Sequence, residues 1–275
     1  MSKKPTRTLS SRLLIEPGSD VSLSDHDPAA TFGWKQNGDL DRKLRKNLAR
    51  IDELQYVLYA ENKRALLLVL QGMDASGKDG VIRHVMSGFN PQGCAVTSFK
   101  APTHEEAEHD FLWRIHINIP RRGDVGIFNR SHYEDVLVVR VHEMVPRKVW
   151  SRRYEMINTF ERHLADNDVV ILKFFLNVSK KEQAKRLQAR IDDPKRQWKF
   201  SPADLDERKL WSRYARAYED VLCRCSSPWA PWYVIPSDRK WFRNLAVSEI
   251  IVETLESMKL KYPPPVAALP RLRIR

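Results

Sequence analysis

A glycine-rich segment, GMDASGKDG, occupies positions 72–80. It follows a mostly apolar run at 64–70 that suits a strand buried on both faces, and a helical pattern begins at Lys78. Glycines let successive backbone N–H groups face one point, and the start of the following helix adds positive potential there. This strand–loop–helix order predicts a phosphate-binding loop with Lys78 as a mobile cation, rather than a glycine-rich turn with a surface lysine.

Two acids lie in this loop. Asp79 stands where Ser or Thr usually follows the lysine, and Asp74 lies earlier in the loop. Because acids beside bound phosphates repel them unless a cation intervenes, we expect Mg²⁺ as a cofactor with Asp74 as its ligand. The alternative for Asp74 is a turn residue bonded to its own backbone. The expected substrate contacts in the loop are Gly72, Ala75, Ser76, Gly77, Asp79 and Gly80.

A second polar segment, IFNRSHYED at 127–135, follows a strand expected at 124–128. In an open parallel sheet, the carboxyl ends of the strands face the ligand crevice. Arg130 can therefore reach phosphate oxygens through two parallel hydrogen bonds. The candidates for metal, water or substrate contacts are Asn129, Glu134 and Asp135.

A third segment at 180–202 is rich in Lys and Arg. Arg186 and Arg190 lie four residues apart and so project from one side of a helix. Lys199 belongs to a cluster of cations where this helix breaks before the next one. Two helices that meet at a charged hinge suit a lid that closes over phosphates, although a solvated basic helix also accounts for the charges.

Strands alternate with helices along the rest of the chain, which predicts an α/β fold with a parallel five-stranded sheet flanked by helices. We expect an irregular lead-in at 1–35, one domain at 36–262 that includes the lid, and a Pro- and Arg-rich tail at 263–275. The strands are expected at 64–70, 95–99, 124–128, 169–178 and 232–235. The helices are expected at 40–58, from 78 to about 88, from Thr103 past Ile115, after Ser179, after Ser201 and at 245–260.

The chain has 47 Lys and Arg against 35 Asp and Glu, a net charge of +12. This excess fits a nucleic acid, a lipid headgroup or a phosphate polymer as partner, or a solvated surface that keeps the protein soluble. No apolar stretch approaches the roughly 20 residues of a membrane helix, so we expect no membrane partner. The N-terminus lacks the apolar region of a secretory signal, and three cysteines are an odd number, so we expect a cytoplasmic protein with reduced thiols.

Taken together, the segments at 72–80, 128–135 and 180–202 resemble those of the polyphosphate kinase 2 family, in the family's order, over about residues 40–262. The resemblance implies a thymidylate-kinase-like P-loop core with a helical lid and Mg²⁺ dependence. It implies reversible transfer of a terminal phosphoryl group between inorganic polyphosphate and ADP to give ATP. The NRSHYED stretch resembles the subgroup that also accepts AMP. Polyphosphate would then be the partner of the positive charge.

The resemblance also implies residue roles by position. The residues it marks as catalytic are the loop acid Asp74, the loop lysine Lys78, the Walker B arginine Arg130, and the lid arginines Arg186 and Arg190. Many family members have Asp where Asn129 stands, which removes one carboxylate and leaves the metal ligands beyond Asp74 open. A homo-oligomer is also expected.

Two other functions remain possible at this point. One is a P-loop kinase that uses ATP to phosphorylate a nucleotide or another small molecule, with an incidental basic surface. The other is a non-enzymatic P-loop module that binds nucleic acid, which ranks last because the sequence has no helix-turn-helix or zinc pattern. The identity of the phosphoryl donor, ATP or polyphosphate, distinguishes the small-molecule kinase from a polyphosphate kinase. The salt dependence of binding to duplex DNA, compared with polyphosphate, tests the nucleic-acid-binding module.

Overall fold

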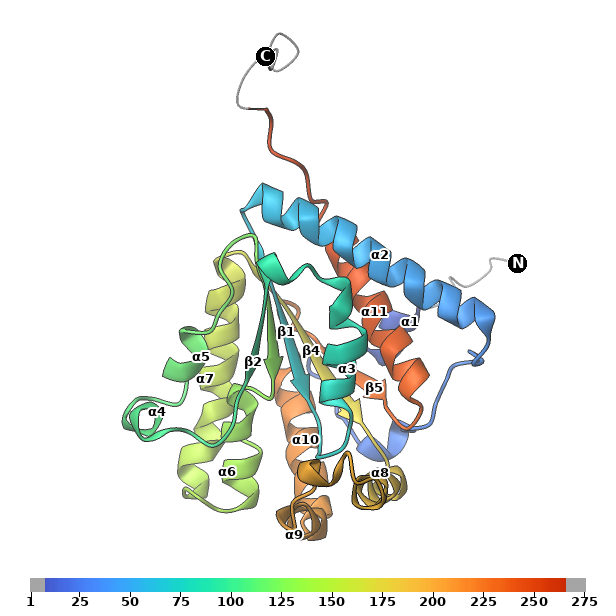
Figure 1. Cartoon of the computed structure of the whole chain (residues 1–275). Coiled ribbons are helices and arrows are strands. Elements are labelled where there is room, and N and C mark those ends of the chain that lie inside the picture. The colour runs from blue at the N-terminus through green and yellow to red at the C-terminus, as the bar shows by residue number, and fades with distance from the viewer. Residues whose placement is uncertain (1–7, 266–275) are drawn as a thin grey trace, which may run out of the picture.

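The computed structural model describes residues 8–265 and is built on one five-stranded parallel sheet (Figure 1). The strands are β1 (Ala65–Gln71), β2 (Cys94–Ser98), β3 (Val125–Asn129), β4 (Val169–Asn177) and β5 (Trp232–Pro236). Their order across the sheet is β2-β3-β1-β4-β5, and every pair is parallel. The α/β fold and the five-stranded parallel sheet predicted from the sequence are therefore confirmed.

Strand β1 lies at the centre of the sheet, and all seven of its residues are buried. Leu70 is in register with Asn129 of β3 on one side and with Phe174 of β4 on the other. The continuous apolar sequence of β1 follows from this position, because helices cover both faces of the sheet. The glycine-rich loop thus leaves the sheet from its middle strand.

Helices cover the two faces of the sheet in separate layers (Figure 1). One layer consists of α2 (Gly38–Glu61), α3 (Lys78–His84) and α11 (Lys240–Ser257), and it packs on Leu66, Leu68 and Leu70. The other consists mainly of α7 (Arg147–Asp166) and α10 (Trp211–Cys225), packed on Leu67 and Val69. Successive β1 side chains therefore enter different cores, as strand geometry requires.

The remaining helices are short except for one. The α-helices are α1 (Leu9–Leu13), α4 (His104–Glu108), α5 (Trp113–His116), α6 (Val138–Val141), α8 (Lys180–Asp192) and α9 (Ala203–Lys209). The 3₁₀ turns are Leu23–Asp25, Met86–Gly88, Pro91–Gly93, His132–Asp135 and Gln197–Lys199. Within residues 8–265, no helix combines the length and the apolar character needed to cross a membrane.

Two local expectations were wrong, and two long helices were missed. The helix that starts at the Thr103 capping box ends at Glu108, because Asp110 accepts a hydrogen bond from the Leu112 backbone at 2.9 Å and starts a new turn. The last helix begins at Lys240 instead of 245, without a side-chain cap that the sequence could have signalled. The long helices α7 and α10 were not predicted as separate elements.

The expected irregular lead-in is ordered against the sheet in its described part. The Ile15 backbone N–H donates to the Trp232 carbonyl at 2.9 Å, and Leu14 bridges Tyr233 in antiparallel fashion. Leu13 and Ile15 are buried in the two cores. Of the expected tail, 266–275 lies outside the described residues, and the division into lead-in, domain and tail stays a prediction.

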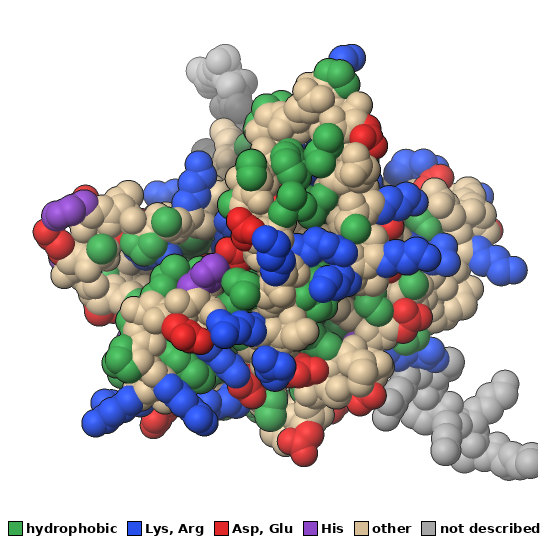
Figure 2. All heavy atoms as spheres, turned by 90° about the horizontal axis from the view of Figure 1, so that it is seen from below, with side chains coloured by type: hydrophobic (Ala, Val, Ile, Leu, Met, Phe, Trp, Pro, Cys, Tyr) green, Lys and Arg blue, Asp and Glu red, His purple; other side chains and the backbone are tan. Residues whose placement is uncertain are grey.

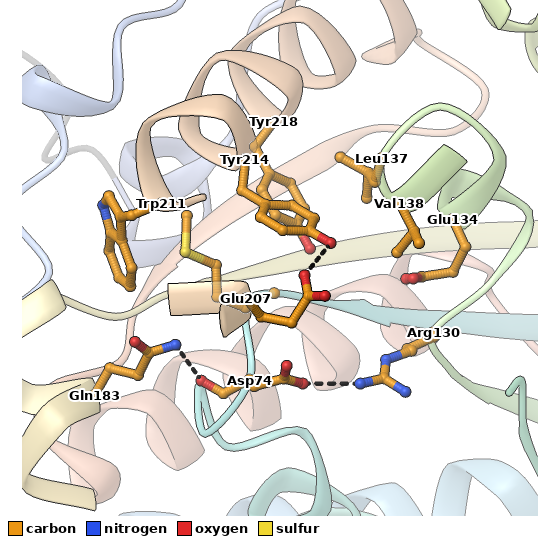
Figure 3. A pocket seen from close by; sticks show the side chains of 12 residues that line it. Asp74, Arg130, Glu134, Leu137, Val138, Gln183, Glu207, Trp211, Tyr214 and Tyr218 are labelled. Carbon is orange, nitrogen blue, oxygen red and sulfur yellow. Dashed lines mark hydrogen bonds and ion pairs between the residues drawn. The ribbon is translucent and has the colours of Figure 1, made fainter. Parts of the chain in front are cut away.

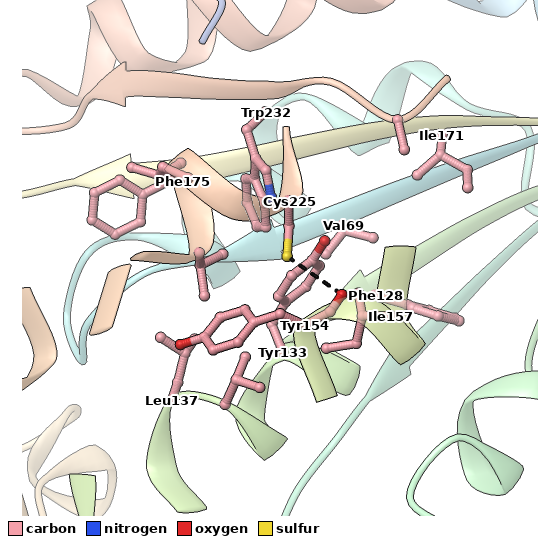
Figure 4. Packing of buried hydrophobic residues seen from close by; sticks show 14 of the residues in the cluster. Val69, Phe128, Tyr133, Leu137, Tyr154, Ile157, Ile171, Phe175, Cys225 and Trp232 are labelled. Atoms are coloured by element: carbon pink, nitrogen blue, oxygen red, sulfur yellow. Dashed lines mark hydrogen bonds between the residues drawn. The ribbon is translucent and has the colours of Figure 1, made fainter. Parts of the chain in front are cut away.

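A buried polar network lies in the core beneath the 3₁₀ turn at 132–135. The Lys173 ammonium donates to Glu161 Oε2 at 2.5 Å, to the Tyr133 hydroxyl at 2.8 Å and to the Cys225 carbonyl at 2.7 Å. Figure 4 shows Tyr133 among apolar side chains beside Trp232, with ring centroids 4.9 Å apart. All three donors of this buried ammonium are satisfied, as a buried cation requires.

Candidate active site

The glycine-rich loop begins where β1 ends and leads into α3 at the lower edge of the sheet in Figure 1. Its curvature needs glycine at two positions. Gly77 has a φ of +114°, and a Cβ on Gly72 would lie 2.9 Å from the Leu176 carbonyl oxygen. The strand–loop–helix arrangement predicted from the sequence is therefore present, with the loop's backbone turned at the amino end of α3.

Lys78 folds back onto the loop. Its side chain is buried, and its Nζ donates to the carbonyls of Gly72 at 2.6 Å and of Met73 at 3.4 Å. Burial and, to a lesser extent, the nearby positive charge of Arg130 lower its pKa to about 8, against the opposing effect of the surrounding carboxylates. Part of the Lys78 population is thus neutral near pH 8. An anion bound beside it would raise the pKa of Lys78 and favour the charged ammonium form.

Asp74 and Arg130 form an ion pair over the loop, with 2.8 Å between Asp74 Oδ1 and an Arg130 guanidinium nitrogen (Figure 3). The Arg130 backbone has a φ of +65° and its N–H donates to the Leu70 carbonyl at 3.0 Å, which turns the chain as β3 ends. Glu134 lies in the same pocket. Burial raises its pKa, and the charges of Arg130 and Lys78 oppose that rise.

Helix α8 joins this site from the third segment. Arg186 donates to the carbonyls of Ala75 at 3.0 Å and Ser76 at 2.9 Å, and it pairs with Glu182 at 2.9 Å. Gln183 Nε2 donates to the Asp74 carbonyl at 2.9 Å (Figure 3). The structure thus brings Arg186 to the loop, where it holds backbone carbonyls of Ala75 and Ser76.

The other lid residues lie farther along. Arg190 lies 3.5 Å from Asp204 of α9, and Lys199 Nζ lies 3.9 Å from Asp79 Oδ2. The opposite oxygen of Asp79 accepts a hydrogen bond from Asn129 Nδ2 at 3.1 Å. Asp79 therefore connects the end of β3 and the lid. It does not line the pocket that contains Asp74.

A pocket opens beside the loop, with about 450 Å³ of space including its mouth. Its far side was not predicted from the sequence. It consists of Leu137 and Val138 from the segment at α6 and of Trp211, Tyr214 and Tyr218 from α10 (Figure 3). The aromatic residues are spaced by three and four along α10, a helical pattern that could have indicated one shared face.

Two hydrogen bonds hold the rim of this pocket. The Tyr214 hydroxyl donates to Glu207 Oε2 at 2.7 Å, and the other oxygen of Glu207 lies 2.9 Å from His142 Nε2. Glu207 belongs to α9, which follows the lid, and His142 follows α6. The pocket is thus apolar and aromatic at one end and charged at the end formed by Asp74 and Arg130.

The donor chemistry of this site fits Mg²⁺. Asp74 and Glu134 supply carboxylate oxygens beside the loop, which are hard ligands of the kind that Mg²⁺ prefers. Residues 8–265 contain no group of three or more His, Cys, Asp or Glu side chains arranged to hold a metal ion. That is compatible with Mg²⁺, which is usually held by one or two carboxylates together with substrate phosphates and water.

Phosphate binding is expected to raise the pKa of Lys78, so the protein should take up protons as it binds a phosphate ligand. At pH 8 the difference in proton uptake between the wild-type protein and Lys78→Met should be about half a proton per site, because the Lys78 ammonium is then half titrated. At pH 6.5 the difference should vanish. Calorimetric titration with tripolyphosphate in two buffers of different ionisation enthalpy measures it, and equal uptake by both proteins at pH 8 would contradict the assignment.

Lys and Arg side chains gather across the face that carries the site. Figure 2 views the molecule from below, where basic side chains form a broad group with Asp and Glu side chains interspersed. The excess of positive charge in the sequence is therefore partly concentrated at the edge of the sheet where the loop lies. Such a surface attracts extended anions.

Comparison with known proteins gives a consistent result. The sequence model of the family described as polyphosphate kinase 2 matches residues 35–263. An AMP/ADP-polyphosphate phosphotransferase of Meiothermus ruber is 53% identical over 94% of this chain and 98% of its own length. An ADP-polyphosphate phosphotransferase of Rhodopseudomonas palustris is 52% identical over 80% of each chain. The crystal structure of polyphosphate kinase 2 from Arthrobacter aurescens superimposes with a TM-score of 0.91 at 42% identity, covering 96% of this chain and 95% of that one. With its phosphate-binding loop at the centre of a parallel sheet, this chain belongs to the polyphosphate kinase 2 family.

Proposed function

We propose that this protein transfers a terminal phosphoryl group between inorganic polyphosphate and ADP, and also AMP, by in-line displacement. The observation that carries the proposal is the single site in which a phosphate-binding loop, the Asp74–Arg130 pair and an aromatic pocket adjoin. A polymer of phosphates suits the charged end, and a nucleotide base suits the aromatic end. The names of the relatives in Meiothermus ruber and Rhodopseudomonas palustris support the same substrates.

In this proposal, Lys78 and the loop N–H groups hold a phosphate, and Arg130 neutralises charge that develops during transfer. Asp74 and Glu134 would hold Mg²⁺, which supplies neutralisation of the phosphate oxygens when it is bound. Arg186 would keep the loop carbonyls of Ala75 and Ser76 in place. Arg190 and Lys199 are proposed to reach phosphates when the lid closes, since their present carboxylate partners are 3.5 and 3.9 Å away and are loose ion pairs.

Trp211→Ala is expected to raise the KM for ADP by about 5- to 150-fold, because stacking of a base on an aromatic ring contributes roughly 1–3 kcal/mol. The KM for polyphosphate should stay within about twofold of the wild-type value. Steady-state kinetics with each substrate varied in turn measures both constants. Trp198→Ala is the matched control, because Trp198 is 78% exposed and lies outside the pocket. An equal rise in both KM values for Trp211→Ala would show that the nucleotide base does not bind in this pocket.

The proposed activity is tested by incubating the protein with Mg²⁺, polyphosphate and either ADP or AMP, and by separating the nucleotides formed. ATP from ADP, and ADP from AMP, are the expected products. If ATP phosphorylates a nucleoside monophosphate rapidly while polyphosphate is neither used nor inhibitory, the protein is an ATP-dependent nucleotide kinase instead. Omission of Mg²⁺ or addition of a chelator should abolish the reaction.

We also propose a cytoplasmic location and a homo-oligomer. All three cysteines are free thiols, which supports a reducing compartment. Among residues 8–265, the outer strand β2 has no partner on one edge, and its Val96 is exposed. Ile117, whose neighbour Asn118 accepts a hydrogen bond from Thr97 of β2 at 3.3 Å, is 63% exposed, and both features support association with a second copy. Light scattering coupled to size-exclusion chromatography measures the mass in solution, and a mass of one chain at all concentrations would exclude the oligomer.

A further inference from the structure

Within residues 8–265, Arg243 is a buried cation without a carboxylate partner. It lies in the first turn of α11 and is 2% exposed. Its Nε and Nη2 donate to the side-chain oxygen of Asn244 at 3.1 and 2.9 Å. Among residues 8–265, no ion pair includes Arg243. Buried arginines are normally paired with acids, because an uncompensated buried charge is costly.

This guanidinium lies directly against the phosphate-binding loop. A Cβ built on Gly77 would lie 1.9 Å from Arg243 Nη1, and a Cβ built on Gly80 would lie 2.7 Å from Nη2. The phosphate-binding motif itself does not require glycine at position 80, and glycine in a helix is otherwise unfavourable. The Arg243 guanidinium therefore occupies the space beside both glycines, and a side chain at 77 or 80 would have to displace it.

The surroundings of Arg243 add to its charge instead of balancing it. Burial and, to a lesser extent, the neighbouring Arg186 together lower the pKa of Arg243 to about 10. Lys240, one turn earlier, also has a lowered pKa because of burial, Arg186 and Arg243. The carboxylate on this side, Glu182, is already paired with Arg186 at 2.9 Å. The first turn of α11 contains no acid and carries the positive end of the helix dipole.

We propose that Arg243 is a positioning residue of the phosphate-binding loop at 72–80. Its positive charge lies behind Gly77 and Gly80 and is balanced only when the loop binds phosphate groups. The guanidinium does not contact the ligand. It acts through the loop, by adding positive potential behind the backbone N–H groups and by fixing the two glycines. That polyphosphate supplies these phosphates rests on the proposed function. The cost of burying the charge is present in the ligand-free protein and is offset on binding.

The first test removes the charge. Arg243→Met keeps most of the side-chain length, and Arg45→Met, at an exposed position on α2, is the control with the same change in net charge. The melting temperature is measured without ligand and with tripolyphosphate. We expect the ligand-free Arg243→Met protein to melt at or above the wild-type temperature, and the shift caused by tripolyphosphate to fall by at least half. A lower melting temperature together with a full ligand-induced shift would show a merely structural role and overturn the proposal.

The second test keeps the guanidinium and supplies its missing partner. Asn244→Asp places a carboxylate on the side chain that already accepts from Nε and Nη2. The proposal predicts a more stable ligand-free protein and at least tenfold weaker tripolyphosphate binding by calorimetry. Unchanged affinity in this variant would overturn the proposal even if Arg243→Met failed to fold. Arg243→Lys should recover part of the affinity lost in Arg243→Met.

Kinetics separates this inference from the proposed function. In Arg243→Met the KM for polyphosphate should rise at least tenfold, while the KM for ADP stays within about twofold. If the wild-type protein shows no turnover with polyphosphate, the proposed function fails. The binding experiments with tripolyphosphate still decide the role of Arg243, because they need only a phosphate anion in the loop.

Discussion

Lys78→Ala should lower the rate of ATP formation from ADP and polyphosphate by at least about 100-fold, because one cation that neutralises transferring phosphate contributes roughly 3–4 kcal/mol. The effect should be large for a second reason. The Lys78 ammonium also donates to the carbonyls of Gly72 and Met73, so its removal leaves the loop less ordered. Coupled assays of ATP at saturating substrates measure the rate.

Lys63→Ala provides the matched control for this experiment. Lys63 is an exposed lysine that follows α2, on the chain just before β1 and outside the pocket. Its variant should retain wild-type activity. Circular dichroism and thermal melting of both variants show whether they are folded. If folded Lys78→Ala protein retains full activity, the loop at 72–80 is not the phosphoryl-transfer site.

Lys173→Met should destabilise the protein by about 3–5 kcal/mol, the typical cost of removing one partner from a buried ion pair. The substitution leaves Glu161 fully buried, and it takes a donor from the Tyr133 hydroxyl and the Cys225 carbonyl. Urea unfolding measures the change in the free energy of unfolding. Lys63→Met, at the exposed position, should change it by less than about 0.5 kcal/mol.

A double variant separates the charge from the packing. Glu161→Gln with Lys173→Met removes both charges, so its stability should exceed that of Lys173→Met alone by about 2 kcal/mol. Tyr133 belongs to the 3₁₀ turn that also carries Glu134, so the single variant should lose activity as well. If the double variant is no more stable than the single one, an uncompensated charge is not the cause of the loss.

The candidate site was predicted in part. The loop residues, Asp74 and Arg130 do meet at one edge, because strands that alternate with helices bring the carboxyl ends of β1 and β3 together. The aromatic side of the pocket was missed, since Trp211, Tyr214 and Tyr218 lie far along the chain on a helix that was not separately predicted. Their helical spacing indicates a face but does not say what that face covers.

Two arginines illustrate the same limit. The spacing of Arg186 and Arg190 predicts a shared helix side, yet Arg186 reaches carbonyls of the loop and Arg190 lies near Asp204. Their partners depend on where the loop and α9 pass, which local spacing does not specify. The sequence did not indicate that Arg243 is buried, because the predicted last helix began at 245 and a single arginine just before it reads as an exposed charge.

The sequence by itself determined the alternation of strands and helices, the parallel sheet and the phosphate-binding loop, because hydrophobic period and glycine placement act over a few neighbouring residues. Only the tertiary structure decided which side chains face one another: Arg243 against Gly77, Lys173 with Glu161, and α10 over the pocket. These contacts join residues far apart in the chain, and their energies depend on burial and on the distance between charges, neither of which a local pattern contains.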